Sequence, residues 1–120
     1  MTHDDAARWL DRYVEAWRTY DPDTIASLFA EDVEYRYHAW DEPIRGRDAI
    51  VADWLSDQDA AGTWQAAYTP WAVDGNRFVS RGTSRYFEEG GDRVYHNVFF
   101  VELDDDARAT SFTEVFAQES

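Results

Sequence analysis

The chain has 120 residues, the size of a single domain with a core of its own. Its formal net charge of −14 argues against nucleic acid as a partner, because phosphate binding depends on clustered Lys and Arg. It contains no Cys, and its three His lack metal-binding spacing, so we expect neither a disulfide nor a metal site. With no apolar run long enough to span a bilayer and no signal-peptide pattern in MTHDDAARW, we expect a cytoplasmic protein with no membrane contact.

Three helices are predicted in the first half of the chain. Asp4 and Asp5, followed by apolar residues at helical spacing, predict a helix over residues 4–20. Asp21 and Pro22 have the residue types of a helix cap and first position, which predicts a shorter second helix. Residues 33–38 are expected to be extended. A third helix is predicted to start after Gly46 and to end before residue 61.

The second half of the chain has the pattern of β-strands. Strands are predicted over residues 63–73, 76–87, 93–103 and 107–118, separated by three turn-forming segments rich in Asp, Asn or Gly. Helices gathered at one end of a chain must cover one face of the sheet that the strands form. The expected fold is therefore α+β, with three helices packed on one face of a curved, mainly antiparallel sheet that forms a cone.

The strand over residues 93–103 has apolar residues on both faces. Val94, Val98 and Phe100 alternate with residues of the second set, which includes Tyr95 and Phe99. A sheet covered by helices on one face alone should have polar residues on the other. We therefore expect the outer face to pack against a second copy of the chain as a homodimer.

Four stretches resemble the SnoaL-like branch of the nuclear transport factor 2 superfamily: DPDTIASLFAEDVEYRY, EPIRGRDAIVADW, AVDGNRFVSRG and SFTEVF. The resemblance extends over nearly the whole chain, from residue 7 to residue 116. The resemblance implies three helices on a bent sheet, a pocket between them and a dimer. Members of this superfamily include ketosteroid isomerases, polyketide cyclases, limonene epoxide hydrolase, dehydratases and binders without activity, so the fold places the pocket without naming its chemistry.

The ketosteroid isomerase pattern is only partly reproduced. The tyrosine of the first helix that polarises the substrate carbonyl in those enzymes falls on Tyr13, which matches. The position of their aspartate base falls on Tyr37, and that of their second, protonated aspartate falls near Asn97 or Phe99. Because both carboxylates are missing, isomerase activity by that mechanism is not expected. The aspartate–arginine–aspartate arrangement of the epoxide hydrolase is not reproduced either.

Glu114 is the first candidate for a catalytic residue. It shares a strand face with Phe112 and Phe116, so we expect its carboxylate to lie in an apolar pocket. Burial there would raise its pKa toward neutrality, as suits a general acid or base. The alternative is a structural ion pair with an inward-pointing Arg.

Arg81, Thr83 and Arg85 alternate along their strand with Ser and Gly. In the register that the superfamily implies, the two arginines point into the cone, where they would pair with Glu114 or hold a ligand oxygen. A shift of one residue would leave them exposed. Gly82 favours the first arrangement, since a residue without a side chain on the outer face would let a dimer partner approach.

His38 is the second candidate proton carrier, because its ordinary pKa lies near neutrality. It lies beside Trp40 and Asp41 at the expected pocket mouth, and the alternative is a hydrogen-bonded structural role, as for His96. Asp53, on the third helix, is expected to face solvent. The residues expected to contact a ligand are Trp17, Tyr35, Tyr37, Arg81, Thr83, Arg85, Asn97, Phe99, Phe112 and Phe116.

Two classes of function follow from these residues. The first is a cofactor-independent enzyme that performs acid–base chemistry on a carbonyl, epoxide or polyketide-like substrate, with Glu114 or His38 as proton carrier and Tyr13 as hydrogen-bond donor. The second is a protein that binds a small organic molecule without converting it. A third alternative, a docking module for another protein, would use the sheet face that we assign to the dimer.

Overall fold

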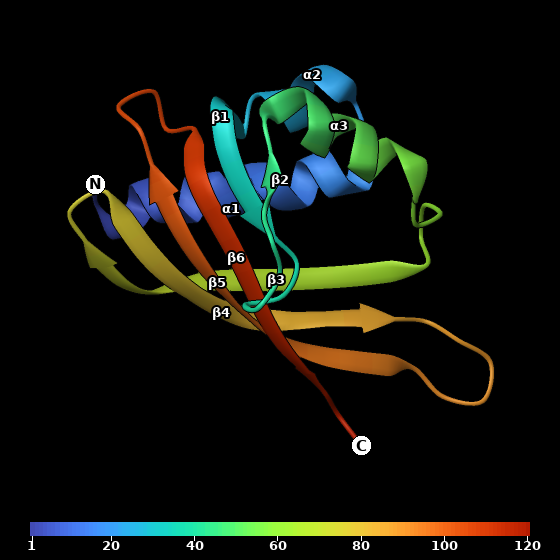
Figure 1. Ribbon diagram of the computed structural model, residues 1–120. Coiled ribbons are helices and arrows are strands. Elements are labelled where there is room, and N and C mark those ends of the chain that lie inside the picture. The colour runs from blue at the N-terminus through green and yellow to red at the C-terminus, as the bar shows by residue number, and fades with distance from the viewer.

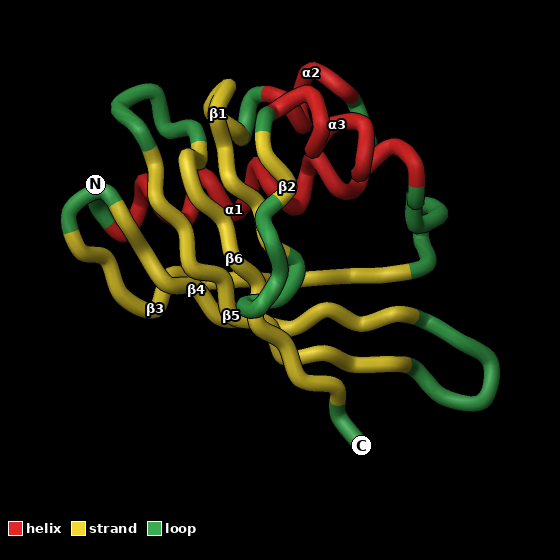
Figure 2. Tube along the Cα trace, viewed as in Figure 1, coloured by secondary structure: helices red, strands yellow, loops and turns green.

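The computed structural model describes residues 1–120 and packs three helices against a curved sheet of six strands (Figures 1 and 2). The helices are α1 (His3–Thr19), α2 (Pro22–Ala26) and α3 (Arg47–Ser56). The strands are β1 (Phe29–Arg36), β2 (Ile44–Arg45), β3 (Trp64–Asp74), β4 (Arg77–Tyr86), β5 (Arg93–Leu103) and β6 (Ala109–Gln118). Their order is β2-β1-β6-β5-β4-β3, and all neighbours are antiparallel except β1 and β6. The predicted α+β fold is confirmed.

Helix α1 begins at a capping box. The Thr2 hydroxyl accepts a hydrogen bond from the Asp5 amide at 3.1 Å, and the Asp5 carboxylate accepts one from the Thr2 amide at 2.8 Å. The helix ends where Tyr20 takes a left-handed conformation with φ of 51°. Its buried face, which includes Trp9 and Tyr13, lies against the sheet. The predicted helix over residues 4–20 is confirmed to within one residue at each end.

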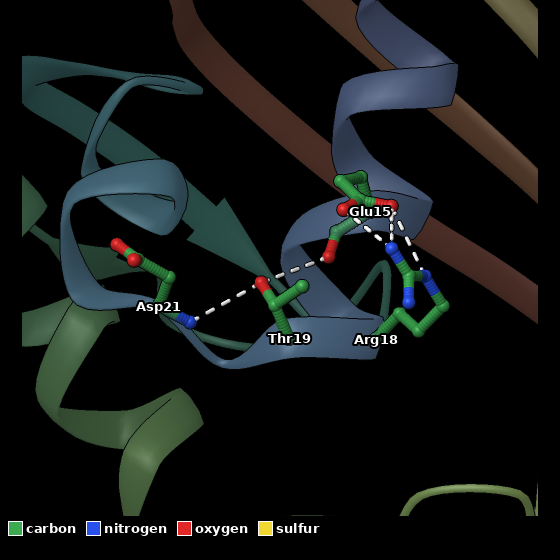
Figure 3. Close-up of polar contacts among 4 residues, drawn as sticks. All are labelled: Glu15, Arg18, Thr19 and Asp21. Atoms are coloured by element: carbon green, nitrogen blue, oxygen red, sulfur yellow. Dashed lines mark hydrogen bonds and ion pairs between the residues drawn. The ribbon is translucent and has the colours of Figure 1, made fainter.

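The turn from α1 to α2 is held by side chains at its two ends (Figure 3). Arg18 Nε donates to Glu15 Oε2 at 3.0 Å, and the Thr19 hydroxyl donates to the Glu15 carbonyl at 3.1 Å. The Thr19 oxygen in turn accepts from the Asp21 amide at 3.3 Å. The Asp21 carboxylate then caps α2 by accepting from the amides of the first helical turn, as predicted.

Helix α3 and strand β2 are less well predicted. Gly46 precedes α3 with φ of 95°, a conformation that favours glycine, but the helix ends at Ser56, before the predicted limit. Strand β1 starts at Phe29, four residues before the expected extended segment. Strand β2 was not expected, because two residues cannot display an alternating pattern.

Strands β3 and β4 approach each other closely at Gly82. Gly82 pairs with Tyr68, and a Cβ atom at Gly82 would lie 1.9 Å from the carbonyl oxygen of Ala67 and 2.7 Å from Tyr68 Cα. The missing side chain therefore makes room on the inner face, against Tyr68. The expectation that Gly82 opens the outer face to a partner is wrong.

The core between helices and sheet is built largely of aromatic rings. Tyr35 stacks on Phe112 with centroids 4.5 Å apart, and Phe112 lies 5.6 Å from Tyr13. Trp9, fully buried, donates its indole N–H to the Leu28 carbonyl at 3.2 Å. These buried rings lie beneath the candidate site and support it.

None of the three helices is both long and apolar enough to cross a lipid bilayer.

Candidate functional site

A cavity of about 740 Å³ lies between the helices and the inner face of the sheet. Helices α1 and α3 and the segment after α3 line one side, and strands β1 and β3 to β6 line the other. Ten of its eighteen lining residues are aromatic: Tyr13, Trp17, Tyr20, Tyr35, Tyr37, Trp54, Tyr68, Tyr86, Tyr95 and Phe116. A concave site that combines aromatic side chains with polar groups is typical of small-molecule binding.

Glu114 lies in this cavity, on the face of β6 that points toward the helices. Burial raises the pKa of its carboxyl above the ordinary value, while a hydrogen bond from Asn97 and the charge of nearby His38 act in the opposite direction. Asn97 Nδ2 donates to Glu114 Oε2 at 2.6 Å. The buried position was predicted, but the predicted partner was wrong: Glu114 is bonded to Asn97 and not to Arg81 or Arg85. Glu114 forms no ion pair.

The bond to Glu114 is one end of a chain of polar side chains along the cavity floor. Asn97 Oδ1 accepts from the Ser84 hydroxyl at 2.8 Å. Because the Ser84 proton is used in that bond, the hydroxyl of Tyr68 donates to the Ser84 oxygen. Four side chains on four neighbouring strands, β3 to β6, are thus linked. The carboxyl group of Glu114 is the acceptor at the end of the chain.

Two tyrosine side chains line the floor of the cavity beside Glu114. Burial raises the pKa of Tyr13 well above its ordinary value, and the nearby Tyr35 and Glu114 raise it further. Burial also raises the pKa of Tyr35, again reinforced by Glu114. Both phenols therefore keep their protons at neutral pH and can donate a hydrogen bond. Tyr35 was predicted to face the cone, and it does.

Tyr37 joins α3 to the end of β1. Its hydroxyl donates a short hydrogen bond to Asp53 Oδ2, and burial followed by the neighbouring Tyr35 and Asp53 raises its pKa. Both side chains line the cavity. The expectation that Asp53 faces solvent was wrong, because α3 presents that position to the cavity rather than to the outside.

One part of the cavity lining combines an aromatic and an acidic side chain, Trp17 and Asp59. Trp17 Nε1 donates to Asp59 Oδ2 at 3.0 Å, and the Trp17 ring stacks on Trp64 with centroids 3.6 Å apart. Trp17 was expected among the ligand contacts, and it does line the cavity. Asp59 was not singled out, since it lies in a polar segment after α3 that has no periodic pattern.

His38 lies beside the cavity rather than in its lining. Its Nδ1 lies 2.9 Å from Asp41 Oδ2, and its ring stacks on Trp40 at 4.8 Å. The ring is also 5.7 Å from that of Phe116, which does line the cavity. The hydrogen-bonded arrangement matches the structural alternative considered for His38.

Arg81, Thr83 and Arg85 lie on the outer face of β4 and are exposed. The prediction that the arginines point into the cone was wrong by one residue of register. Arg85 instead pairs with Asp92 at 3.2 Å, and the Arg81 guanidinium lies 4.2 Å from the ring centre of Trp71. The inward set contains Ser84, which the sequence interpretation had placed outward. Both sets in this strand are rich in polar residues, so alternation could not distinguish them.

Two further predicted ligand contacts lie beneath the cavity. Phe99 and Phe112 are almost fully buried and pack on each other with centroids 4.9 Å apart, under the lining residues. They support the floor without lining it. Tyr95 does line the cavity and could have been found, since it shares the strand face of Asn97 and Phe99. Tyr86 could not, because its strand had been assigned the opposite register.

Comparison with known proteins places this architecture in a family. The family model of the SnoaL-like domain matches residues 10–112. The chain belongs to the SnoaL-like family. A search of curated protein sequences finds no match for this SnoaL-like chain.

Two solved structures resemble this SnoaL-like chain in fold. One is an LEH-like epoxide hydrolase from M. tuberculosis, with 19% identity, a TM-score of 0.71, and coverage of 96% of this chain and 84% of that one. The other is an NTF-2 like protein of unknown function from Burkholderia xenovorans LB400, with 16% identity, a TM-score of 0.73, and coverage of 98% and 86%. At these identities the likeness establishes the fold alone.

Proposed function

We propose that this SnoaL-like domain binds a small, largely apolar organic molecule in its cavity and moves a proton on it without a cofactor, with Glu114 as general acid or base. The observation that supports this proposal is the environment of Glu114. Its one hydrogen-bond donor is the neutral amide of Asn97, and no Arg or Lys compensates its charge. A partly desolvated carboxylate that forms no ion pair can exchange a proton near neutral pH.

The neighbouring groups have complementary roles in this proposal. Tyr13, which stays protonated because burial raises its pKa, would donate a hydrogen bond to a substrate oxygen and stabilise charge that develops there. Asn97 would hold the Glu114 carboxylate in position as it gains and loses the proton. His38 is a less favoured proton carrier, because it is bonded to Asp41 and lies outside the cavity lining.

The substrate class that fits best is a carbonyl or polyketide-like compound. One fold neighbour is an LEH-like epoxide hydrolase. This chain has no guanidinium beside Glu114, because Arg81 and Arg85 point to the outer face. A protonated Glu114 and the Tyr13 phenol remain as donors, and these suit the polarisation of a carbonyl oxygen.

The test is a turnover screen of small ketones, enones and polyketide-like compounds by mass spectrometry. We expect one or more to be converted by the wild type and by Glu31→Gln, which changes an exposed carboxylate away from the cavity. Glu114→Gln should lower kcat by at least about 100-fold. Conversion that persists in Glu114→Gln would contradict the proposed role of this carboxylate.

A second candidate function is binding of a small organic molecule without turnover, which is the second class of function that the sequence predicts. It is favoured by one observation. Tyr37 falls at the position of the isomerases' aspartate base and Asn97 near that of their second aspartate, and both are engaged in hydrogen bonds within the protein. Compounds that occupy the cavity and are recovered unchanged would support this candidate. Absence of any cavity ligand in the same screen would contradict both candidates.

We also propose a homodimer through the outer sheet face, in the cytoplasm. The supporting observation is a patch of apolar side chains on that face, formed by Val79, Val98, Phe100 and Val115. Val79 pairs with Phe100 and Val98 with Val115 across the strands, so the patch is continuous. Phe100 is 48% exposed and Val115 43% exposed, and a partner would cover them.

A further inference from the structure

The outer part of the cavity is a wall of aromatic rings set at steep angles to one another. Tyr86 and Tyr95 are 5.8 Å apart with an interplanar angle of 88°, and Tyr95 and Phe116 are 5.6 Å apart at 81°. Trp17 continues the row at 6.2 Å from Tyr86. Rings at right angles present both faces and edges to the space they enclose. The π-electrons give each ring face a negative electrostatic potential, which attracts a cation.

The charged residues of the lining are mostly acidic. The lining contains four carboxylates (Asp53, Asp57, Asp59 and Glu114) and one guanidinium, that of Arg93. Asp53 and Asp59 are half-buried, and each accepts a hydrogen bond from a neutral donor, the Tyr37 hydroxyl and the Trp17 indole respectively. These bonds position the carboxylates without neutralising them. The chain as a whole, at −14, adds a negative potential that favours positively charged ligands.

The aromatic wall already holds one cation, the side chain of Arg93. Its guanidinium carbon lies 4.9 Å from the ring centre of Tyr86 and 5.7 Å from that of Tyr95. The same guanidinium is paired with Glu88 and donates to the Tyr95 hydroxyl at 2.7 Å. Its charge is therefore compensated within the protein, and the other carboxylates of the lining are left without a partner of opposite charge.

We propose that the cavity takes a small organic cation, an amine or quaternary ammonium with an apolar body, whose charged head lies against the aromatic wall within reach of Asp53, Asp59 and Glu114. This inference rests on the proposed function and narrows it: the carbonyl compound that the cavity binds would also carry a cationic head. The apolar body would pack on lining rings such as Tyr13, Tyr35 and Trp54, and the head would meet rings and carboxylates. An anionic ligand would find only Arg93, whose charge is already paired, among four carboxylates of like sign.

The test uses three probes that share a benzyl group and a tetrahedral head. These are benzyltrimethylammonium, its neutral carbon isostere neopentylbenzene, and the anion benzylsulfonate. Each is titrated into the protein while the side-chain NMR signals of the lining residues Trp17 and Trp54 are followed. We expect the cation to bind at least about tenfold more tightly than the neutral isostere, and the anion to bind most weakly.

Variants separate the aromatic and acidic contributions. Tyr86→Leu should remove most of the preference for the cation over the neutral isostere, whereas Tyr86→Phe, which keeps the ring face, should retain it. Asp53→Asn should reduce the preference severalfold. Glu31→Gln changes the net charge by the same amount outside the cavity, so it should leave the preference unchanged.

The outcomes distinguish this inference from the proposed function. If the neutral isostere or the anion binds in the cavity as tightly as the cation, the inference is wrong and the cavity is still a ligand site. An equal loss of preference in Glu31→Gln and Asp53→Asn would also overturn it, because overall charge would then explain the selectivity. If none of the three probes shifts the signals of Trp17 and Trp54, the proposed ligand site is wrong as well.

Discussion

The side-chain amide of Asn97 on β5 donates to the carboxylate of Glu114 on β6 at 2.6 Å, diagonally across the two strands. The amide carries no charge, so it orients the carboxylate without supplying the opposite charge that a salt bridge would provide. Burial consequently dominates, and the pKa of Glu114 rises above its ordinary value. The stability of the protein should therefore depend on the protonation state of this one side chain.

Glu114→Gln should stabilise the protein near neutral pH by on the order of 1 kcal/mol. A carboxyl whose pKa is raised by folding binds more protons in the native state than in the unfolded state, so the free energy of unfolding falls as pH rises from the unfolded pKa to the folded one. The advantage of the Gln variant should grow over that interval and then level off. Urea denaturation at several pH values measures it.

The control for this experiment is Glu31→Gln, at an exposed carboxylate with no ion pair. It should not reproduce the stabilisation expected of Glu114→Gln, because its side chain lies outside the cavity. A Glu114→Gln protein that is less stable than the wild type at every pH would mean that the carboxylate acts as a structural ion rather than as a buried acid.

Ser84→Ala should destabilise the protein by about 1–2 kcal/mol, because it leaves the buried groups of Asn97 and Tyr68 without their shared partner. Ser80 provides a matched comparison on the same strand and the same face. It is fully buried and its hydroxyl has no hydrogen-bond partner. Ser80→Ala should therefore be neutral or stabilising. Equal effects of the two substitutions, measured by denaturant unfolding, would contradict the hydrogen-bond chain.

Gly82→Ala should destabilise the fold by about 1–3 kcal/mol or more, since the added methyl group overlaps the backbone of β3. The neighbouring Thr83 faces outward and is exposed, so Thr83→Ala should change stability by less than about 0.5 kcal/mol. Thermal unfolding of the two variants makes the comparison. A Gly82→Ala protein as stable as the wild type would show that β3 and β4 can separate without loss.

Phe100→Asp should convert the proposed dimer into monomers, because it places a charge in the centre of the apolar patch. Phe87→Asp is the matched control: Phe87 is 44% exposed, close to the 48% of Phe100, but lies in the loop after β4. Light scattering should give a dimer for the wild type and the control. Raised salt should tighten it by screening the charge of −14 on each chain. A wild-type particle of only 14.0 kDa would contradict the dimer.

Features determined by local chemistry were predictable from the sequence. The cap at Asp21 and the inward position of Glu114 depend on near neighbours in the chain, and both are confirmed. The orientation of β4 was not predictable, because RGTSR offers two polar faces and the choice between them depends on the strands beside it. The position of Asp53 in the cavity lining was not predictable either, because its carboxylate is bonded to Tyr37, sixteen residues away in the sequence.

The parallel pairing of β1 with β6 has a consequence for how the chain folds. β6 lies between β1 and β5 in the sheet. The first strands of the chain therefore cannot join the rest of the sheet until the last strand has paired with both neighbours. Contacts between segments so distant in sequence slow folding, because the intervening loop must lose its freedom first. Since β6 also carries Glu114, we expect the binding cavity to be assembled in the last step of folding, and a ligand to bind only the completed sheet.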